Sequence, residues 1–398
     1  MKRFADYQNK IERSYTLGID SMNVLHINCN YMGTTLHSVM INHLNKFNIN
    51  NIVFCPVLKN TESDCSKDKN VIISKCFNKY DRYFYFLKQY KIYKALRQEC
   101  DLNQIDIIHA YTLYTDGNIA YKINKLFKIP YVVTVRMTDI YFFRFRKYLL
   151  LRGLTILLNS NCIYFLSKKT LDYVIDSFIP KRYRDEIRSK SVVVKNGIDD
   201  YWLDNVYSNR DYLQIKNKFD TKKLNILCVA QIMKRKGIPN IQNAIDILNS
   251  KGWSSHLTVI GKKFNYDEFN IIISNKNTTY IEPMPKEQLI EYYRQSDIFV
   301  LPSVRETFGL VYAEAMSQGL PVLYTLNEGF DGQYMDGEVG YSIISSDPED
   351  IAKKIIEVCC NYEKISKKCI CEVHRYRWND ICEMYFNAYE KYAGKRSV

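Results

Sequence analysis

The chain has 398 residues, enough for two domains of ordinary size. It is 46% hydrophobic and 25% charged, as globular proteins are, and it has no apolar run of roughly 18 residues that would predict a membrane-spanning helix. The N-terminal segment lacks the apolar core of a signal peptide, and the twelve cysteines lack the paired CxxC spacing of a zinc site. These features predict reduced thiols and a cytoplasmic location.

The formal net charge of +13 is unevenly distributed. Residues 1–200 contain 31 Lys and Arg against 18 Asp and Glu, whereas residues 201–398 contain 25 of each class. A basic first half indicates an anionic partner, which could be a membrane surface, a phosphorylated acceptor or nucleic acid. Charge alone does not choose among these three.

Residues 1–21 are polar and aperiodic, and we expect them to form a poorly docked leader. Met22 opens a strand-like run, which is followed by a loop containing Gly33 and then by apolar residues at helical spacing. This order is typical of the first βα unit of a doubly wound domain. Further buried strands are predicted at 51–57, 70–75, 105–110, 130–135, 162–167 and 191–195.

Two stretches of the first half, 79–96 and 141–152, combine aromatic and basic residues. Each could be a helix at a membrane interface, with rings among the lipid headgroups and cations on the phosphates. Each could equally be a helix whose rings face the core and whose basic edge is solvated. Both interpretations stay open, and the excess charge of this half adds weight to the interfacial one.

The second half repeats the pattern of strand, loop and helix. A buried strand starts near Leu224, and the basic run Lys234-Arg235-Lys236 follows it. Such a run is often only a solvated loop, but its position directly after a strand favours anion binding. Other features are the turn Asn196-Gly197, the strand-to-glycine turn at Gly261, the loop 280–285 with Pro283, and an apolar-periodic helix from Trp378 to Tyr392.

The most informative stretch is 296–322. A short apolar run closed by Pro302 predicts a buried parallel strand, and 308–318 predicts a helix that Gly319 ends. Another buried strand follows. The loop between the first strand and the helix therefore lies at the carboxyl end of a parallel strand, where ligands of open α/β sheets bind.

Two carboxylates belong to this unit. Glu306 lies in the loop, and Glu314 lies eight residues later in the helix. Taken alone, the pair could be ordinary surface charges. The amides at the start of the helix suit an anion such as a diphosphate, and carboxylates beside them suit the hydroxyls of a sugar and a ribose.

The order Pro-Ser, Glu-x-Phe-Gly, Glu-Ala-Met and Gly-x-Pro-Val over 302–322 resembles the signature of glycosyltransferase family 4, the retaining enzymes of the GT-B fold. The resemblance extends over roughly 22–392 and is stronger in the second half. It implies an α/β protein with two doubly wound Rossmann-like domains that face a central cleft. The implied parts are an acceptor domain (22–199), a nucleotide-sugar donor domain (200–376) and a C-terminal helix within 377–398 that crosses back to the first domain.

The resemblance also implies a site. Glu306 would hold sugar hydroxyls and Glu314 the ribose, while Lys236 and a neighbouring cation would neutralise the diphosphate in place of a metal ion. His109 would face the cleft from the first domain. The other implied donor-site residues are Gly33, Asn196, Gln231, Arg235, Gly261, Pro283, Thr307, Phe308, Gly309 and Leu310.

Two positions depart from the commoner family pattern. Arg136 stands where the family usually has histidine, and arginine cannot act as a base. Arg136 would then stabilise charge or bind the acceptor, with Asp139 close behind it. Gln231 stands where the family usually has arginine, so Arg235 or Lys234 would supply the second cation.

These features predict a metal-independent glycosyltransferase that moves a sugar from a nucleotide-diphosphate sugar to a carbohydrate or lipid-linked acceptor with retention, in cell-surface polysaccharide synthesis. No Asp-x-Asp motif is present, and we expect no metal, no further cofactor and no nucleic-acid partner. The basic first domain would allow peripheral association with the inner face of the cell membrane.

Two other classes of protein stay open. A GT-B-shaped nucleotide-sugar epimerase would turn over the donor without an acceptor. A non-catalytic basic protein that binds membrane or nucleic acid would keep all its measurable behaviour after Glu306→Ala and Glu314→Ala.

Overall fold

The computed structural model describes residues 21–33, 35–61, 69–144 and 146–393, and for 141–144 it describes the backbone only. The predicted leader, 1–21, lies outside these residues apart from Ser21. The chain divides into two compact units. Met1–Leu166, Thr170–Lys195 and Trp378–Val398 form unit 1, and Ser167–Lys169 and Asn196–Arg377 form unit 2.

Unit 1 is built on a seven-stranded sheet of order β3-β2-β1-β4-β5-β6-β7, and its neighbouring strands pair in parallel. The strands are β1 (Met22–Ile27), β2 (Ile49–Leu58), β3 (Val71–Phe77), β4 (Ile107–Ala110), β5 (Tyr131–Val135), β6 (Cys162–Phe165) and β7 (Ser191–Val193). The strand order reverses at β1, because β2 lies on one side of it and β4 on the other. The carboxyl ends of β1 and β4 therefore form a topological switch point, the usual ligand position in such sheets.

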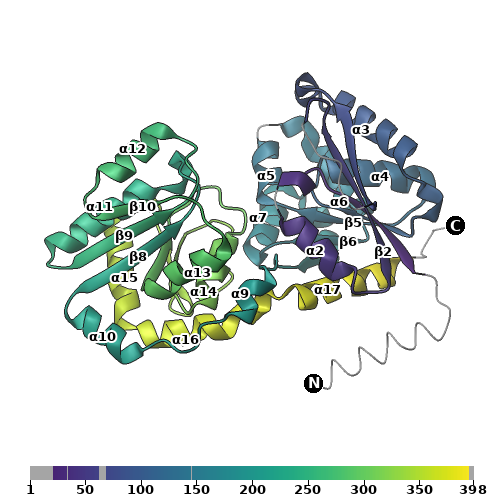
Figure 1. Cartoon of the computed structure of the whole chain (residues 1–398). Helices are drawn as coiled ribbons and strands as arrows, with labels where there is room; N and C mark the ends of the chain where they lie inside the picture. Colours follow the sequence, from purple (N-terminus) through teal and green to yellow (C-terminus); the bar gives the residue numbers. More distant parts are fainter. Residues whose placement is uncertain (1–20, 34, 62–68, 145, 394–398) are drawn as a thin grey trace, which may run out of the picture. The chain divides into compact units, whose positions relative to one another are not determined.

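Helices cover both faces of this sheet (Figure 1). They are η1 (Tyr31–Gly33), α2 (Leu36–Leu44), η2 (Lys79–Arg82), α3 (Tyr85–Glu99), η3 (Leu102–Gln104), α4 (Asp116–Phe127), α5 (Met137–Arg144), η4 (Lys147–Leu149), α6 (Leu150–Asn159), α7 (Lys168–Phe178), η5 (Lys181–Tyr183), α8 (Arg184–Ser189) and α17 (Trp378–Tyr392). Successive strand residues point to opposite faces. Val132 accordingly packs in the core cluster of α2 and α17, and Val133 in the cluster of α3, α4, α6 and α7.

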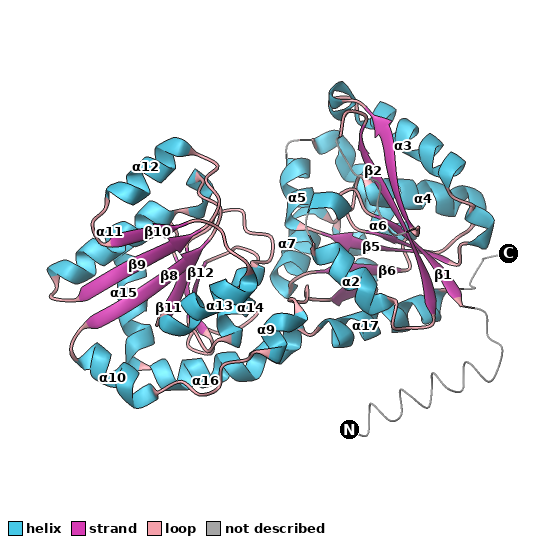
Figure 2. Cartoon of the chain, in the orientation of Figure 1, coloured by secondary structure: helices cyan, strands magenta, loops and turns pink. Residues whose placement is uncertain are grey.

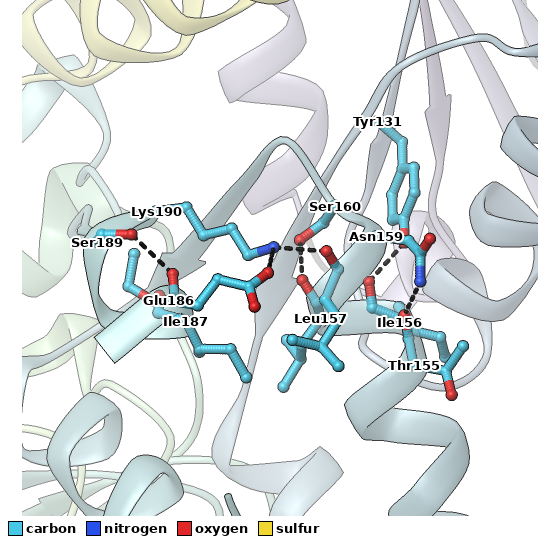
Figure 3. Close-up of polar contacts among 12 residues, drawn as sticks. Tyr131, Thr155, Ile156, Leu157, Asn159, Ser160, Glu186, Ile187, Ser189 and Lys190 are labelled. Carbon is cyan, nitrogen blue, oxygen red and sulfur yellow. Dashed lines mark hydrogen bonds and ion pairs between the residues drawn. The ribbon is translucent and has the colours of Figure 1, made fainter. Parts of the chain in front are cut away.

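Side-chain bonds hold the end of α6 and the helix α8 beside the last strands of unit 1 (Figure 3). Lys190 Nζ lies 3.3 Å from Glu186 Oε1 and donates to Leu158 O at 2.6 Å. The Asn159 side-chain amide donates to Thr155 O at 2.8 Å. Both accepting carbonyls lie toward the end of α6, where a helix lacks intrahelical donors for its last carbonyls.

Unit 2 has a six-stranded sheet of order β10-β9-β8-β11-β12-β13, also parallel (Figure 2). The strands are β8 (Lys223–Val229), β9 (Ser254–Ile260), β10 (Thr278–Ile281), β11 (Ile298–Leu301), β12 (Val322–Thr325) and β13 (Gly340–Ile343). The helices are α9 (Asp200–Asp204), α10 (Tyr212–Asp220), η6 (Lys234–Lys236), α11 (Ile238–Ser250), α12 (Tyr266–Ser274), α13 (Lys286–Gln295), α14 (Leu310–Ser317), α15 (Pro348–Cys360), α16 (Tyr362–Glu372) and η7 (Val373–Tyr376). The order reverses at β8, so the carboxyl ends of β8 and β11 form the switch point of this sheet.

The predicted fold class, two doubly wound parallel α/β domains, is confirmed. Two details differ from expectation. The stretch 141–152 is not one helix, because it divides among the end of α5, η4 and the start of α6. The helix predicted over 308–318 begins at Leu310, since Gly309 has a left-handed φ of 71° that a right-handed helix cannot include.

Candidate active site

The loop between β11 and α14 carries the predicted Glu306. An added Cβ on Gly309 would lie 2.5 Å from the Tyr312 ring, and φ is positive there, so the turn into α14 requires glycine. Tyr312 N donates to Gly309 O at 3.0 Å, but the amides of Leu310 and Val311 open α14 and have no acceptors within the helix. They place the positive end of the helix dipole at the carboxyl edge of the sheet, which favours an anion there.

Lys236 reaches Glu306 across this edge. Lys236 Nζ lies 2.6 Å from Glu306 Oε2, and only 11% and 15% of the two side chains are exposed. The backbone joins their loops, because Val304 N donates to Arg235 O at 2.8 Å. Gly237 permits this approach, since an added Cβ would lie 2.7 Å from a backbone oxygen just after β11. The structure thus joins Lys236, predicted to bind the diphosphate, and Glu306, predicted to bind the sugar, in one ion pair.

A third carboxylate, Glu328, holds the Glu306 loop. Glu328 Oε2 accepts a hydrogen bond from Glu306 N at 2.8 Å, and Gly329 N donates to Glu306 O at 3.0 Å. The packing is close, because an added Cβ on Gly329 would lie 2.2 Å from Thr307 O. Arg305 has a left-handed φ of 63°, which costs free energy for a residue other than glycine. Glu328 and Gly329 therefore hold a strained loop in place, and no sequence motif marked Glu328.

Glu314 lies on α14, and its Oε2 accepts a hydrogen bond from Tyr293 OH at 3.2 Å. Burial raises the pKa of Glu314 to about 7, the hydrogen bond from Tyr293 opposes the rise, and the charge of Asp199 adds to it. Tyr293 is fully buried on α13, and no sequence motif marked its contact with Glu314. Glu314 consequently changes charge near neutral pH, a property found most often at functional sites.

The other predicted donor-site residues of unit 2 have varied surroundings. Thr307 N donates to Glu306 Oε1 at 3.3 Å, and Phe308 is buried with its ring 5.9 Å from that of Tyr376. Gly261 is required where it stands, because an added Cβ would lie 1.8 Å from a backbone oxygen after β8. Gln231, Arg235 and Pro283 are exposed, and the described hydrogen bonds join none of their side chains to the Lys236–Glu306 pair.

In unit 1, Asp139 lies beside the carboxyl end of β5. Its Oδ2 accepts hydrogen bonds from Arg136 N at 3.0 Å and from Leu113 N at 3.1 Å, and the residue is 7% exposed. Burial raises the pKa of Asp139 to about 6, and the two backbone bonds oppose the rise. Its carboxylate holds the loops after β4 and β5 together, and a catalytic part for Asp139 stays a prediction.

Arg136 is half-buried at the same strand end, and its Nη2 lies 3.2 Å from His37 Nε2. Burial, together with smaller effects of the charges of Arg136 and His26, lowers the pKa of His37 to about 3. The ring is therefore neutral and can accept a hydrogen bond from the guanidinium. His37 positions Arg136, whose part in charge stabilisation or acceptor binding stays a prediction.

His109 is buried in the core of unit 1 rather than exposed at its surface, and a catalytic part for it stays a prediction. The residue is 0% exposed, with Nδ1 2.6 Å from Tyr389 OH and Nε2 2.9 Å from Thr134 Oγ1. His109 points to the same face of β4 as Ile107, which packs in the cluster that α17 covers. Burial lowers the pKa of His109 well below its ordinary value, so the ring is neutral. Both of its nitrogens are hydrogen-bonded inside the core.

Gly33 and Asn196 are the remaining predicted donor-site residues. Gly33 ends η1, is exposed, and would leave an added Cβ with no atom within 4 Å, so the fold does not require glycine there. Asn196 is 9% exposed between β7 and α9. Their predicted donor contacts stay predictions.

Within the described residues, no group of three or more His, Cys, Asp or Glu could hold a metal ion. In the same parts of the chain, no helix has the length and apolar character needed to cross a bilayer. The cysteines that the structure describes are free thiols.

Two family models match the chain. The model for glycosyl transferases group 1 matches residues 209–370, and the model for glycosyltransferase family 4 matches residues 39–201. An uncharacterized glycosyltransferase of Methanocaldococcus jannaschii is 24% identical over 310 residues, which are 74% of this chain and 77% of that protein. The capsular polysaccharide biosynthesis glycosyltransferase CapM of Staphylococcus aureus is 30% identical over 165 residues, 40% of this chain and 42% of that protein.

Solved structures share the fold at low sequence identity. Sucrose-phosphate synthase from Thermosynechococcus elongatus matches with a TM-score of 0.72 at 15% identity, over 93% of this chain and 98% of that chain. HepE of Anabaena in complex with UDP-glucose matches with a TM-score of 0.66 at 13% identity, over 93% and 100%. These likenesses and the two parallel sheets show the GT-B fold, and the two family matches identify the protein as a glycosyltransferase.

The two family matches cover most of both halves. The chain belongs to glycosyltransferase family 4, group 1.

Proposed function

We propose that the protein transfers a sugar from a nucleotide-diphosphate sugar to a saccharide or lipid-linked saccharide, with retention of the anomeric configuration, in cell-surface polysaccharide synthesis. The observation that carries this proposal is the Lys236–Glu306 ion pair, 2.6 Å long, beside the first turn of α14. A diphosphate needs a cation and backbone amides, and a sugar needs a carboxylate for its hydroxyls. This loop supplies all three. The similarity to CapM favours the polysaccharide role, and the fold shared with HepE favours a UDP-sugar donor.

In the proposed reaction, the bond from the anomeric carbon to the diphosphate oxygen breaks, and its electron pair leaves with the diphosphate. Lys236, the exposed Arg235 or Lys234, and the α14 amides stabilise the developing charge. The acceptor oxygen bonds to the anomeric carbon on the face that the diphosphate leaves, and its proton passes to a diphosphate oxygen. Glu306 binds sugar hydroxyls and so orients the anomeric carbon, and Glu314 binds the ribose.

Donor binding tests this proposal directly. We would measure thermal shift of the wild type with UDP-, GDP-, ADP- and dTDP-sugars, because a ligand of the native state raises the melting temperature. We expect one nucleotide to stabilise the wild type and the control Lys251→Ala, an exposed lysine elsewhere on unit 2, but not Lys236→Ala. A wild type that no donor stabilises would overturn the proposed donor site.

Product analysis tests the stereochemistry and the class of reaction. Proton NMR of the disaccharide should give the same anomeric configuration as the donor sugar. Donor turnover that continues at full rate without any acceptor, yielding a second nucleotide sugar, would instead identify an epimerase.

We also propose that the transfer needs no divalent metal, because Lys236 and a cation of η6 would neutralise the diphosphate, a role that a metal ion fills in other enzymes. Turnover in EDTA should equal turnover in magnesium. Loss of activity in EDTA with recovery on adding magnesium would overturn this part alone.

A further inference from the structure

We propose that η2 and the start of α3 form the surface by which unit 1 binds an anionic lipid bilayer. Six large apolar side chains of this segment are between 44% and 76% exposed. They are Tyr80, Tyr83, Phe84, Phe86, Leu87 and Tyr90, named here the aromatic surface. Soluble proteins rarely expose so many neighbouring large apolar side chains without a partner for them.

The aromatic surface is held rigidly, because the opposite face of α3 is anchored in the core. Tyr85, Ile92 and Leu96 pack in the cluster that covers one face of the sheet. Tyr85 OH donates to Tyr114 O at 2.8 Å, and the buried Gln89 accepts from the Asn118 side chain at 2.8 Å. Residues three and four apart share a helix face, so this anchoring turns Phe86 and Tyr90 outward. The anchored face of α3 fits the core-facing interpretation of the stretch 79–96, and the outward face carries the rings that the interfacial interpretation needs.

The charge around the aromatic surface suits lipid phosphates. Residues 79–98 contain six Lys and Arg and one acidic residue, Asp81. Asp81 is buried and paired with Lys91 at 2.7 Å, so it presents no free negative charge. Lys79, Arg82 and Lys94 are exposed. Rings in the headgroup region with cations on the phosphates are the pattern by which amphipathic helices bind anionic bilayers.

This composition favours a bilayer over a nucleic acid or a protein groove. Phe84, Phe86 and Leu87 offer no hydrogen bond to a base edge or a peptide. A bilayer interface accepts apolar side chains from successive helix positions without shape complementarity, whereas a protein groove needs one matched stripe. Lys94 lies on the same side of α3 as Phe86 and Tyr90, so these rings and this cation could contact one bilayer surface at the same time.

The aromatic surface borders the edge of the sheet where an acceptor would bind. The start of α3 follows the carboxyl end of β3, and parallel strands share one carboxyl edge with the switch point of β1 and β4. The start of α3 contacts the loop after β4, because Tyr85 OH donates to Tyr114 O at 2.8 Å. A lipid-linked acceptor would therefore enter from the bilayer side, an extension that rests on the proposed function.

Vesicle flotation of the full chain tests the surface. We would compare phosphatidylcholine vesicles with vesicles containing about one third phosphatidylglycerol. We expect the wild type to bind the anionic vesicles at least tenfold more strongly. Tyr83→Ser/Phe84→Ser/Phe86→Ser should lose tenfold or more of this binding, and serine at position 84 still suits the N-cap of α3. Lys79→Gln/Arg82→Gln/Lys94→Gln should lose the preference for anionic lipid.

A matched control removes equally exposed apolar side chains from unit 2. Leu213→Ser/Ile271→Ser/Ile273→Ser, at 70%, 51% and 50% exposure, should float as the wild type does. Binding that is equal for the wild type and the aromatic variant would overturn the proposal. So would displacement of the wild type from vesicles by an oligonucleotide that binds the aromatic surface.

The same variants separate this proposal from the proposed function. The aromatic variant should keep the wild-type thermal shift with the donor nucleotide sugar. Lost flotation with a kept donor shift supports both proposals. A flat donor panel with lost flotation overturns the proposed function only, and a donor shift with unchanged flotation overturns the bilayer surface only.

Discussion

Lys236 and Glu306 are 70 positions apart in the chain, yet their charged atoms lie 2.6 Å apart at the carboxyl edge of one sheet. Each belongs to a loop that leaves a central strand, β8 or β11, and the two loops are joined by a backbone hydrogen bond. The pair therefore has two roles that mutations can separate. It stabilises the fold of unit 2, and it supplies the cation and the carboxylate proposed for the donor.

Lys236→Ala should lower both stability and activity. Removing one partner leaves a largely buried carboxylate unpaired, which costs about 1 to 3 kcal/mol of unfolding free energy. Loss of a charge-stabilising donor should reduce kcat/KM by about 100-fold or more. The double variant Lys236→Ala/Glu306→Gln should recover much of the stability in urea titrations but none of the activity. Recovery of both would restrict the pair to a structural role.

Glu328→Ala should impair the reaction by loosening the Glu306 loop. We expect kcat/KM to fall about tenfold. Glu328 positions the Glu306 loop, and a misplacement of about 1 Å is costly in catalysis. Glu328→Gln should keep most of the activity, since an amide oxygen can still accept the bond from Glu306 N. The matched control is Glu338→Ala, whose carboxylate accepts from Met335 N at 2.7 Å away from this loop. Equal losses for Glu328→Ala and the control would refute the positioning role.

The sequence predicts the β11–α14 unit well because local signals agree there. A buried apolar run ends at Pro302, and the turn at Gly309 needs a positive φ, so loop and helix follow from neighbouring residues. Contacts between distant loops leave no such trace. Glu328 meets Glu306 only because β12 pairs with β11, and nothing in its own neighbourhood marks the contact.

His109 shows the same limit in unit 1. Its strand is predicted correctly. Whether the His109 side chain is buried depends on which helix covers that face of the sheet, and the strand itself does not show this. That helix is α17, whose Tyr389 lies 280 positions later. The aromatic stretch 79–96 is ambiguous for a related reason, because its rings divide between two faces of α3.

Arg210 should be essential to the stability of unit 2. It is 7% exposed, and its guanidinium donates to the backbone oxygens of Gln318, Ser296 and Tyr293 and to Tyr362 OH, at 2.8 to 3.1 Å. Arg210→Met leaves these buried acceptors unpaired and should lower the free energy of unfolding by about 3 to 5 kcal/mol in urea titrations.

Arg294→Met is the control for Arg210. Arg294 also makes several hydrogen bonds, but its side chain is 29% exposed, so water can replace its contacts. We expect a loss of about 1 kcal/mol or less. A loss as large as that of Arg210→Met would show that burial is not the reason for the large contribution of Arg210 to the free energy of unfolding.

Glu314 should make donor binding depend on pH. Its pKa is raised to about 7, so the neutral form prevails in the folded protein below that pH, and a ribose hydroxyl is bound best by the carboxylate. Donor affinity should therefore rise as the pH increases from 6 to 8. Tyr293→Phe removes a hydrogen bond that lowers this pKa, and it should move the rise to higher pH. Glu314→Gln should bind weakly with no such rise, and a wild-type profile in Tyr293→Phe would contradict the coupling.

Ionisation of Glu314 should also lower the free energy of unfolding as the pH rises. A carboxyl group whose pKa is higher in the folded state than in the unfolded state loses its contribution to stability as the pH rises from its ordinary value of 4.5 through about 7. The variant Glu314→Gln cannot ionise and escapes that loss. Its free energy of unfolding should match that of the wild type near pH 4.5 and exceed it by about 1 to 3 kcal/mol at pH 8. Urea titrations of both proteins at the two pH values measure this difference, and a difference that is the same at both would show that folding does not shift the pKa of Glu314.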